Sequence, residues 1–285
     1  MSNRRFAALS ANRPPGTNPM QSCTSGRHTV NIPAQARPGL PASMTYFLSA
    51  HAYCCEFEDG AIILDINDDT YLGIDAEHLS NLRIRVGNWP DPGQANQEIK
   101  CQDAAVSEGL ISDLLARQIL TTSPESRPLT TATQPKTALT IASSAMARRG
   151  IPITHGAQFV LAFLMVSMRL KLRGLSSVLG RLRQLQSSIP RYSHSTLPEN
   201  TINQLASFVK LRIWCYTAHR RCLFNSLVLS AYLTRGMVPC TVVIGVSTKP
   251  FLAHSWVQIG DAVLDDTAEH VQTFKTILCI GECAQ

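Results

Sequence analysis

Cysteine, histidine and aspartate follow one another within residues 222–266, in an order that could form a nucleophilic centre. Cys222 stands where an apolar helical pattern begins, after the turn-prone residues 217–221, so we expect it at a helix N-terminus. The positive end of the helix dipole favours a thiolate over a thiol, and the neighbouring Arg220 and Arg221 act in the same direction. This environment is typical of a nucleophilic cysteine rather than of a thiol buried within a strand.

A base and an acid are predicted on the hairpin that follows. His254 opens an apolar strand that ends at the turn signal Gly260-Asp261. The chain then returns antiparallel, which brings Asp265 and Asp266 alongside the imidazole, where an acid can fix its tautomer and orientation. A strict two-residue turn places Asp265 on the face of the histidine, whereas a three-residue loop or one bulge places Asp266 there. The spacing therefore leaves both acids open.

Other site chemistries fit the sequence less well. No second cysteine or histidine lies at ligand spacing from Cys222 or His254, which disfavours a zinc site. Ser226 and Ser255 have no G-x-S-x-G elbow around them, which disfavours a serine triad. Without ligand spacing we expect no metal, and because no Gly-rich phosphate-binding loop is found we expect no nucleotide cofactor in this chain.

Composition and charge narrow the class of protein. With 285 residues, 45% hydrophobic and 16% charged, the chain can form two modest domains with packed cores. The net charge is +6, and the basic residues are densest from Arg169 to Arg191, where they alternate with leucines at helical spacing. This pattern predicts the solvated face of an amphipathic helix rather than a nucleic-acid or membrane contact.

Cysteine usage and apolar runs predict a cytoplasmic protein without a membrane span. The nine cysteines are odd in number and contain no C-x-x-C pair, which is typical of a reducing compartment. No secretory signal is recognisable near the N-terminus. The most hydrophobic run, residues 159–168, is about half the length that a bilayer requires.

The pattern along the chain predicts two α+β domains. We expect residues 1–43 to be a disordered or non-native extension, with translation starting at Met44, and residues 123–140 to be a Ser/Thr/Pro linker. Residues 44–122 read as three short strands followed by helices, and residues 141–285 as helices followed by strands. The predicted strands are 46–48, 61–66, 70–74, 241–246, 254–259 and 262–264. The predicted helices begin at 75 and 110 and then span 155–187, with a break near Gly174, and 199–218. A last helix starts close to Arg221 or Cys222 and ends before Gly236.

Residues 209–266 resemble the peptidase domain of lasso-peptide B proteins, which are transglutaminase-like cysteine proteases. The resemblance rests on Cys222-Leu223 with Ser226-Leu227, Val243-Ile244-Gly245-Val246, Pro250-Phe251, Ala253-His254-Ser255-Trp256-Val257, and Val263-Leu264 ahead of two aspartates. It implies that Cys222 is the nucleophile and His254 the base. Asp265 replaces the usual asparagine of the family pattern, so the family register selects Asp266 as the acid.

Residues 44–122 are similar to the small precursor-recognition domain fused to some of these proteins. That domain is similar to the peptide chaperone of pyrroloquinoline-quinone biosynthesis, a winged helix-turn-helix with a three-stranded sheet. The resemblance rests on residues 61–65, 71–74 and 109–110. It implies that the leader of a ribosomally made precursor binds as an added strand on an exposed sheet edge. The candidate contacts are Tyr71, Leu72, Gly73 and Ile74 on the strand and Leu110 and Leu114 on the following helix.

The resemblance implies removal of the leader from a lasso-peptide precursor by thiol chemistry. A partner cyclase similar to asparagine synthetase would join the freed amine to an Asp or Glu side chain, and ATP use would belong to that cyclase. Three alternatives stay open: a transglutaminase-like acyl transfer, a non-catalytic leader-binding escort protein, and a nucleic-acid-binding winged helix. Acidic residues such as Asp65, Asp68 and Asp69 in the first domain argue against the nucleic-acid alternative.

Overall fold

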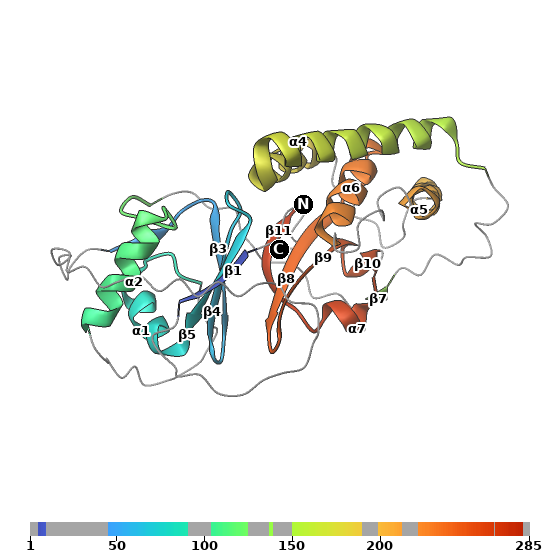
Figure 1. Ribbon diagram of the computed structural model, residues 1–285. Coiled ribbons are helices and arrows are strands. Elements are labelled where there is room, and N and C mark those ends of the chain that lie inside the picture. The colour runs from blue at the N-terminus through green and yellow to red at the C-terminus, as the bar shows by residue number, and fades with distance from the viewer. Residues whose placement is uncertain are drawn as a thin grey trace, which may run out of the picture. The chain divides into compact units, whose positions relative to one another are not determined.

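The computed structural model divides the chain into two compact units, Met1–Pro128 and Leu129–Gln285 (Figure 1). The structure describes residues 5–9, 45–90, 104–124, 137–138, 150–189, 199–212, 222–264 and 266–281. Each unit combines helices with its own sheet, so the fold is of mixed α and β class, as the sequence predicts.

The first unit is a four-stranded sheet, in the order β1-β5-β4-β3, with two helices and a small second sheet, β2-β6. Its elements are β1 (Arg5–Leu9), β2 (Phe47–Leu48), β3 (Ala52–Phe57), β4 (Gly60–Asp65), β5 (Thr70–Asp75), α1 (Ala76–Arg85), α2 (Ala104–Ala116) and β6 (Leu120–Thr121). Strand β4 is buried throughout, as its apolar run predicts. The turn before β5 forms because the Asp65 carboxylate accepts the backbone N–H groups of Asn67 and Asp68.

The core of the first unit lies between the sheet and its helices. Leu79 and Leu82 of α1 and Leu114 of α2 are buried in one cluster with the strand residues Ile63 and Leu72. Helical spacing of the apolar residues predicts these helix faces, and burial of the faces holds the helices against the sheet.

Two strands of the first unit differ from the sequence-based expectation. Strand β3 was not predicted, because Cys54-Cys55-Glu56 interrupts any alternation of apolar and polar residues, yet five of its six residues are buried. Strand β1 lies inside the segment 1–43 that we expected to be disordered, and it pairs in parallel with β5. The other residues of that segment, Met44 included, lie outside the described residues. The winged helix-turn-helix remains a prediction.

In its described residues the second unit has a five-stranded sheet, in the order β11-β8-β9-β10-β7, with three longer helices and one short one. Its elements are β7 (Thr137–Ala138), α4 (Ile153–Gln186), α5 (Glu199–Leu211), α6 (Cys222–Arg235), β8 (Thr241–Thr248), β9 (Phe251–Ile259), β10 (Ala262–Leu264), α7 (Ala268–Val271) and β11 (Lys275–Ile280). Gly174 has φ 74° and ψ −175° inside α4, which confirms the predicted helix break.

Helix α6 is the central element of the second unit. Nearly all of its residues from Leu223 to Thr234 are buried, and it packs against α4 and β9. Ser226 Oγ donates a hydrogen bond of 2.9 Å to the Ser255 carbonyl, which joins α6 to β9. Tyr232 OH donates to the Gln204 carbonyl and Gln204 Nε2 donates back, which joins α6 to α5. The start of α6 is therefore held at a fixed place beside the sheet.

Several elements of the second unit were predicted with different bounds or not at all. Strand β9 begins at Phe251, so His254 lies within the strand instead of opening it. Strand β7, at residues 137–138, lies inside the predicted linker and pairs with β10, whereas residues 125–136 lie outside the described residues. The short helix α7 and the strand β11 were not predicted.

Candidate active site

Cys222 is the first residue of α6, as the apolar pattern predicts. Among the described residues, the cysteines Cys54, Cys55, Cys240 and Cys279 are buried, whereas Cys222 is partly exposed. A residue in the first turn of a helix lies at the positive end of the helix dipole. Cys222 therefore combines access for a substrate with an environment that favours negative charge.

The imidazole of His254 forms a side-chain hydrogen bond with the Cys222 thiol. His254 pairs with Gly245 on the neighbouring strand β8. A Cβ atom at Gly245 would lie 2.8 Å from both Phe274 Cβ and the Trp256 ring. These two aromatic rings in turn lie 5.2 Å and 6.1 Å from the His254 ring, between centroids. The glycine thus leaves room for the aromatic packing that surrounds the imidazole.

Asp266 provides the acid that contacts His254. Its Oδ2 lies 2.6 Å from His254 Nε2, which leaves Nδ1 of the imidazole for the thiol. Asp266 Oδ1 also accepts the backbone N–H of Thr267 at 2.7 Å. The structure therefore brings together the cysteine, the histidine and the aspartate that the sequence singled out.

The register of the hairpin explains why Asp266 reaches the histidine. The turn is the strict two-residue type, since Ala262 pairs with Ile259 and Leu264 with Val257. Continued pairing would have favoured Asp265, which lies outside the described residues. The strand β10 ends at Leu264, so the chain leaves the ladder before Asp266. The simple register count was therefore wrong for Asp266, because it assumed that the strand continues.

His270 is a fourth residue of the site that the sequence reasoning missed. Its Nδ1 lies 2.9 Å and 3.1 Å from the two carboxylate oxygens of Asp266. The Thr267 hydroxyl accepts the backbone N–H of His270 and caps the one-turn helix α7, which places His270 one turn after Asp266. The signal in the sequence is the spacing of four between an aspartate and a histidine.

The charges of the site are set by these contacts. Burial lowers the pKa of His254, but the hydrogen bonds with Asp266 and Cys222 and the charges of both outweigh it and raise the pKa to about 9. Burial raises the pKa of Asp266, but hydrogen bonds from His254, His270 and the Thr267 N–H outweigh it and lower the pKa to about 2. At neutral pH the imidazole is therefore a cation between a carboxylate and the thiol, as a thiolate–imidazolium pair requires.

The same side chains could hold a metal ion. One ligand atom each from His254, Asp266 and His270 lie within 4.8 Å of one another. The sequence spacing did not indicate this cluster, because it forms across a hairpin and a short helix. A metal ion there would occupy the histidine nitrogen and the carboxylate that otherwise hold the imidazole in place, so it would compete with the proton between them.

The predicted leader-contacting residues lie mostly in the core of the first unit. Tyr71, Leu72, Ile74 and Leu114 are buried, whereas Leu110 and Gly73 are partly buried. The outer edge of β5, which we expected to be open, pairs with β1 through all five β1 residues. Because Tyr71, Leu72 and Ile74 are buried, a peptide that paired with β5 would contact mainly the backbone of that strand.

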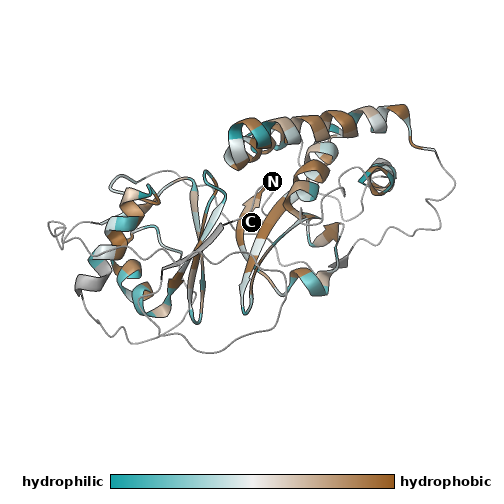
Figure 2. Cartoon of the chain, in the orientation of Figure 1, coloured by the Kyte–Doolittle hydropathy of each residue, from teal (hydrophilic) through white to brown (hydrophobic). Residues whose placement is uncertain are grey.

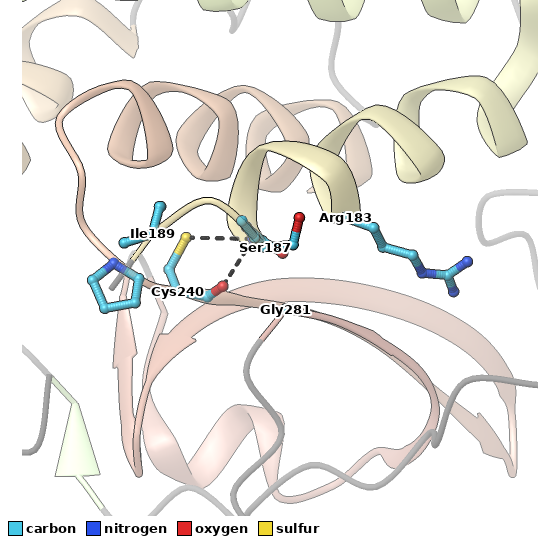
Figure 3. A pocket seen from close by; sticks show the side chains of 7 residues that line it. Arg183, Ser187, Ile189, Cys240 and Gly281 are labelled. Atoms are coloured by element: carbon cyan, nitrogen blue, oxygen red, sulfur yellow. Dashed lines mark hydrogen bonds between the residues drawn. The ribbon is translucent and has the colours of Figure 1, made fainter. Parts of the chain in front are cut away.

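A cavity of about 340 Å³ lies elsewhere in the second unit (Figure 3). It is lined by Arg183, Gln186, Ser187, Ile189, Pro239, Cys240 and Gly281, and none of the site residues above contributes to it. Gln186 Nε2 donates to the Cys240 carbonyl at 2.8 Å. Burial raises the pKa of the Cys240 thiol to about 11, which keeps it protonated and unreactive. Because the only thiol in its lining is protonated, this cavity is not a site for thiol chemistry.

Comparison with known proteins shows that part of the second unit is similar to a broad superfamily. Residues 160–279, from within α4 to the end region of β11, match the family model of the transglutaminase-like superfamily. A search of the curated proteins and a search of the solved structures each gave no match. The matched segment contains Cys222, His254 and Asp266. Residues 160–279 are thus similar to the transglutaminase-like superfamily, a class compatible with a cysteine peptidase or an acyltransferase.

Proposed function

We propose that this chain is a cysteine peptidase that removes the leader from a ribosomally synthesised lasso-peptide precursor. The observation that supports peptidase chemistry is the linear series Cys222, His254 and Asp266, with the cysteine at the start of α6. The lasso-peptide substrate rests on the sequence resemblance of residues 209–266.

In the proposed reaction the Cys222 thiolate attacks the carbonyl carbon before the core peptide. The S–C bond forms and the C–N bond breaks, while the His254 imidazolium gives its proton to the departing amine. The thioester is then hydrolysed by water, and His254 accepts the proton of that water. Asp266 keeps Nε2 of His254 engaged, so Nδ1 faces the sulfur throughout.

Negative charge on the carbonyl oxygen needs hydrogen-bond donors near the sulfur. The backbone N–H of Cys222, in the first turn of α6, is the donor that we propose.

We propose that the first unit binds the leader along β5. The strand β1 already pairs in parallel with this edge of β5, which supports the proposal that the edge can accept an added peptide strand. A leader would then displace residues 5–9 and form main-chain hydrogen bonds to residues 70–74. The freed core would pass to an asparagine-synthetase-like cyclase that uses ATP.

The test is incubation of the purified chain with a candidate precursor, read by mass spectrometry. We expect the masses of leader and core, with cleavage abolished in Cys222→Ala and retained in Cys240→Ala, a control that removes a buried thiol. Processing by Cys222→Ala at the wild-type rate would exclude the peptidase and favour an escort protein.

A primary amine added to the same reaction separates hydrolysis from acyl transfer. A peptidase gives a leader that ends in a carboxylate, whereas an acyltransferase gives a leader joined to the amine. Leader binding is tested separately with the double variant Ala7→Pro/Ala8→Pro, which removes two backbone N–H groups from β1. We expect it to bind a leader peptide more tightly than wild type; weaker or unchanged binding would exclude β5 as the binding edge.

A further inference from the structure

Helix α4 has two apolar faces, and only one of them is covered. Phe159, Ala162 and Val166 on one face are buried in the second unit. The opposite face exposes between half and nine-tenths of six apolar side chains: Ile153, Val160, Leu161, Leu164, Met168 and Leu172. Only 17% of the most apolar window of α4 is buried among the described residues, and Figure 2 shows hydrophobic residues along much of this helix. An exposed apolar surface of this kind marks an interaction site.

The segment of the sequence that contains this face carries charged side chains of one sign. Residues 126–198 contain ten Lys or Arg and no Asp or Glu, which leaves 16 basic against 20 acidic residues in the rest of the chain. Two of these cations, Lys171 and Arg173, are exposed at the end of the apolar face, and Arg148 and Arg149 precede α4 in the sequence. The whole excess of positive charge in this chain therefore belongs to the segment that contains α4.

We propose that the exposed face of α4 docks on the surface of an anionic lipid bilayer. A row of aliphatic side chains flanked by cations and free of acids is complementary to acyl chains below anionic headgroups. Residues 153–173 form a stretch of about 31 Å, at about 1.5 Å per residue, long enough to place all six side chains on one surface.

The helix lies on the bilayer and does not span it. By length and composition α4 could cross a membrane, which differs from our expectation from the ten-residue run 159–168. Its inner face, however, holds aromatic contacts between Phe159 and Tyr232 and between Phe163 and Phe224, at 6.3 Å and 5.5 Å between centroids. Insertion across a bilayer would break these contacts with α6, whereas docking leaves them intact.

Two other occupants fit the face less well. A second copy of the chain would bring Lys171 and Arg173 against the same residues in a two-fold interface, and like charges repel there. A protein partner is typically bound through Trp, Tyr or Arg anchors, and the six exposed side chains are all aliphatic.

The test is co-sedimentation of the full chain with vesicles of phosphatidylcholine alone or mixed with phosphatidylglycerol. We expect binding to the anionic vesicles, weakened as salt rises from 0.05 M towards 0.5 M. The triple variant Leu161→Ser/Leu164→Ser/Met168→Ser should lose roughly tenfold in affinity for each side chain. The pair Lys171→Gln/Arg173→Gln should lose roughly fivefold for each charge.

Ile84→Ser/Met237→Ser is the matched control, because these apolar side chains are equally exposed but lie outside α4. It should bind like wild type. Absence of binding at low salt, or equal binding by the triple variant, would overturn the proposal. A wild-type dimer that the triple variant converts to a monomer would also overturn it, in favour of a second copy. The wild type and the triple variant should cleave a precursor in solution at equal rates, so a loss of vesicle binding can be told apart from a loss of peptidase activity.

Discussion

Replacing Asp266 by Asn should lower the pKa of His254 without removing the side chain that holds it. The carboxylate contact at 2.6 Å contributes to the raised pKa of His254, about 9, and to the lowered pKa of Asp266, about 2. Both pKa values reflect the same contact between His254 and Asp266, and each pKa is also shifted by other neighbouring groups. Attributing about 2 kcal/mol to the contact, we expect the pKa of His254 to fall by about one to two pH units in the variant.

Alkylation of Cys222 measures this pKa without knowledge of the substrate. Iodoacetate is an anion and is attracted by the imidazolium, so its rate should fall as His254 loses its proton, near pH 9 in wild type. In Asp266→Asn the fall should lie one to two pH units lower. Neutral iodoacetamide lacks this attraction and serves as the reference reagent. Mass spectrometry of the peptide that contains Cys222 isolates its signal from the other eight cysteines.

Asp261→Asn is the control, because Asp261 is an exposed carboxylate in the turn of the same hairpin. Its profile should match that of wild type. If the fall in iodoacetate rate stays near pH 9 in Asp266→Asn, then Asp266 does not set the charge of His254 and the electrostatic account of the site is refuted.

Three further predictions follow from the same contacts. His270→Gln removes the imidazole donor to the Asp266 carboxylate, so we expect the pKa of Asp266 to rise and kcat/KM for a precursor to fall severalfold. Glu269→Gln changes an exposed neighbour and should have no effect. Equal activity of the two variants would show that His270 has no positioning role. The raised pKa of His254 stabilises the fold fully below pH 6.5, and this contribution is lost as pH rises through 9. The lowered pKa of Asp266 stabilises it above pH 3.8, and that contribution is lost as pH falls through 2. Urea unfolding should therefore show a loss of about 2–3 kcal/mol between pH 6 and pH 9.5 that is absent in His254→Gln. Gly245→Ala forces Trp256 and Phe274 to move, so we expect urea unfolding to show about 1–3 kcal/mol of destabilisation. Gly260→Ala is strained by its φ of 59° but meets no neighbouring atom, so it should leave the alkylation of Cys222 unchanged.

The sequence predicts the parts of the site that local signals define. The apolar pattern places the start of α6 at Cys222, and Gly260-Asp261 predicts the turn after β9. Both features depend on residues close together in the chain, so periodicity and turn propensity suffice to locate them. The helix break at Gly174 was found in the same way.

The parts that were missed depend on tertiary structure. Whether Asp265 or Asp266 meets His254 depends on where β10 ends, which no turn rule determines. The helix α7 has four residues, too few to show a period, so His270 could not be assigned to the site. The strand β3 is buried although it contains Glu56, whose charge is satisfied by a bidentate pair with Arg83 from α1.

Cys222 and its two partner side chains come from different elements of the second unit. His254 lies on a hairpin and Asp266 follows that hairpin, whereas Cys222 begins a helix that packs on the hairpin through contacts such as Ser226 with Ser255. A slide of α6 by one helical turn, about 5.4 Å, would separate sulfur from imidazole and leave the histidine–aspartate pair assembled. The distance between the sulfur and the imidazole therefore depends on how α6 packs on β9, whereas the contact between His254 and Asp266 does not.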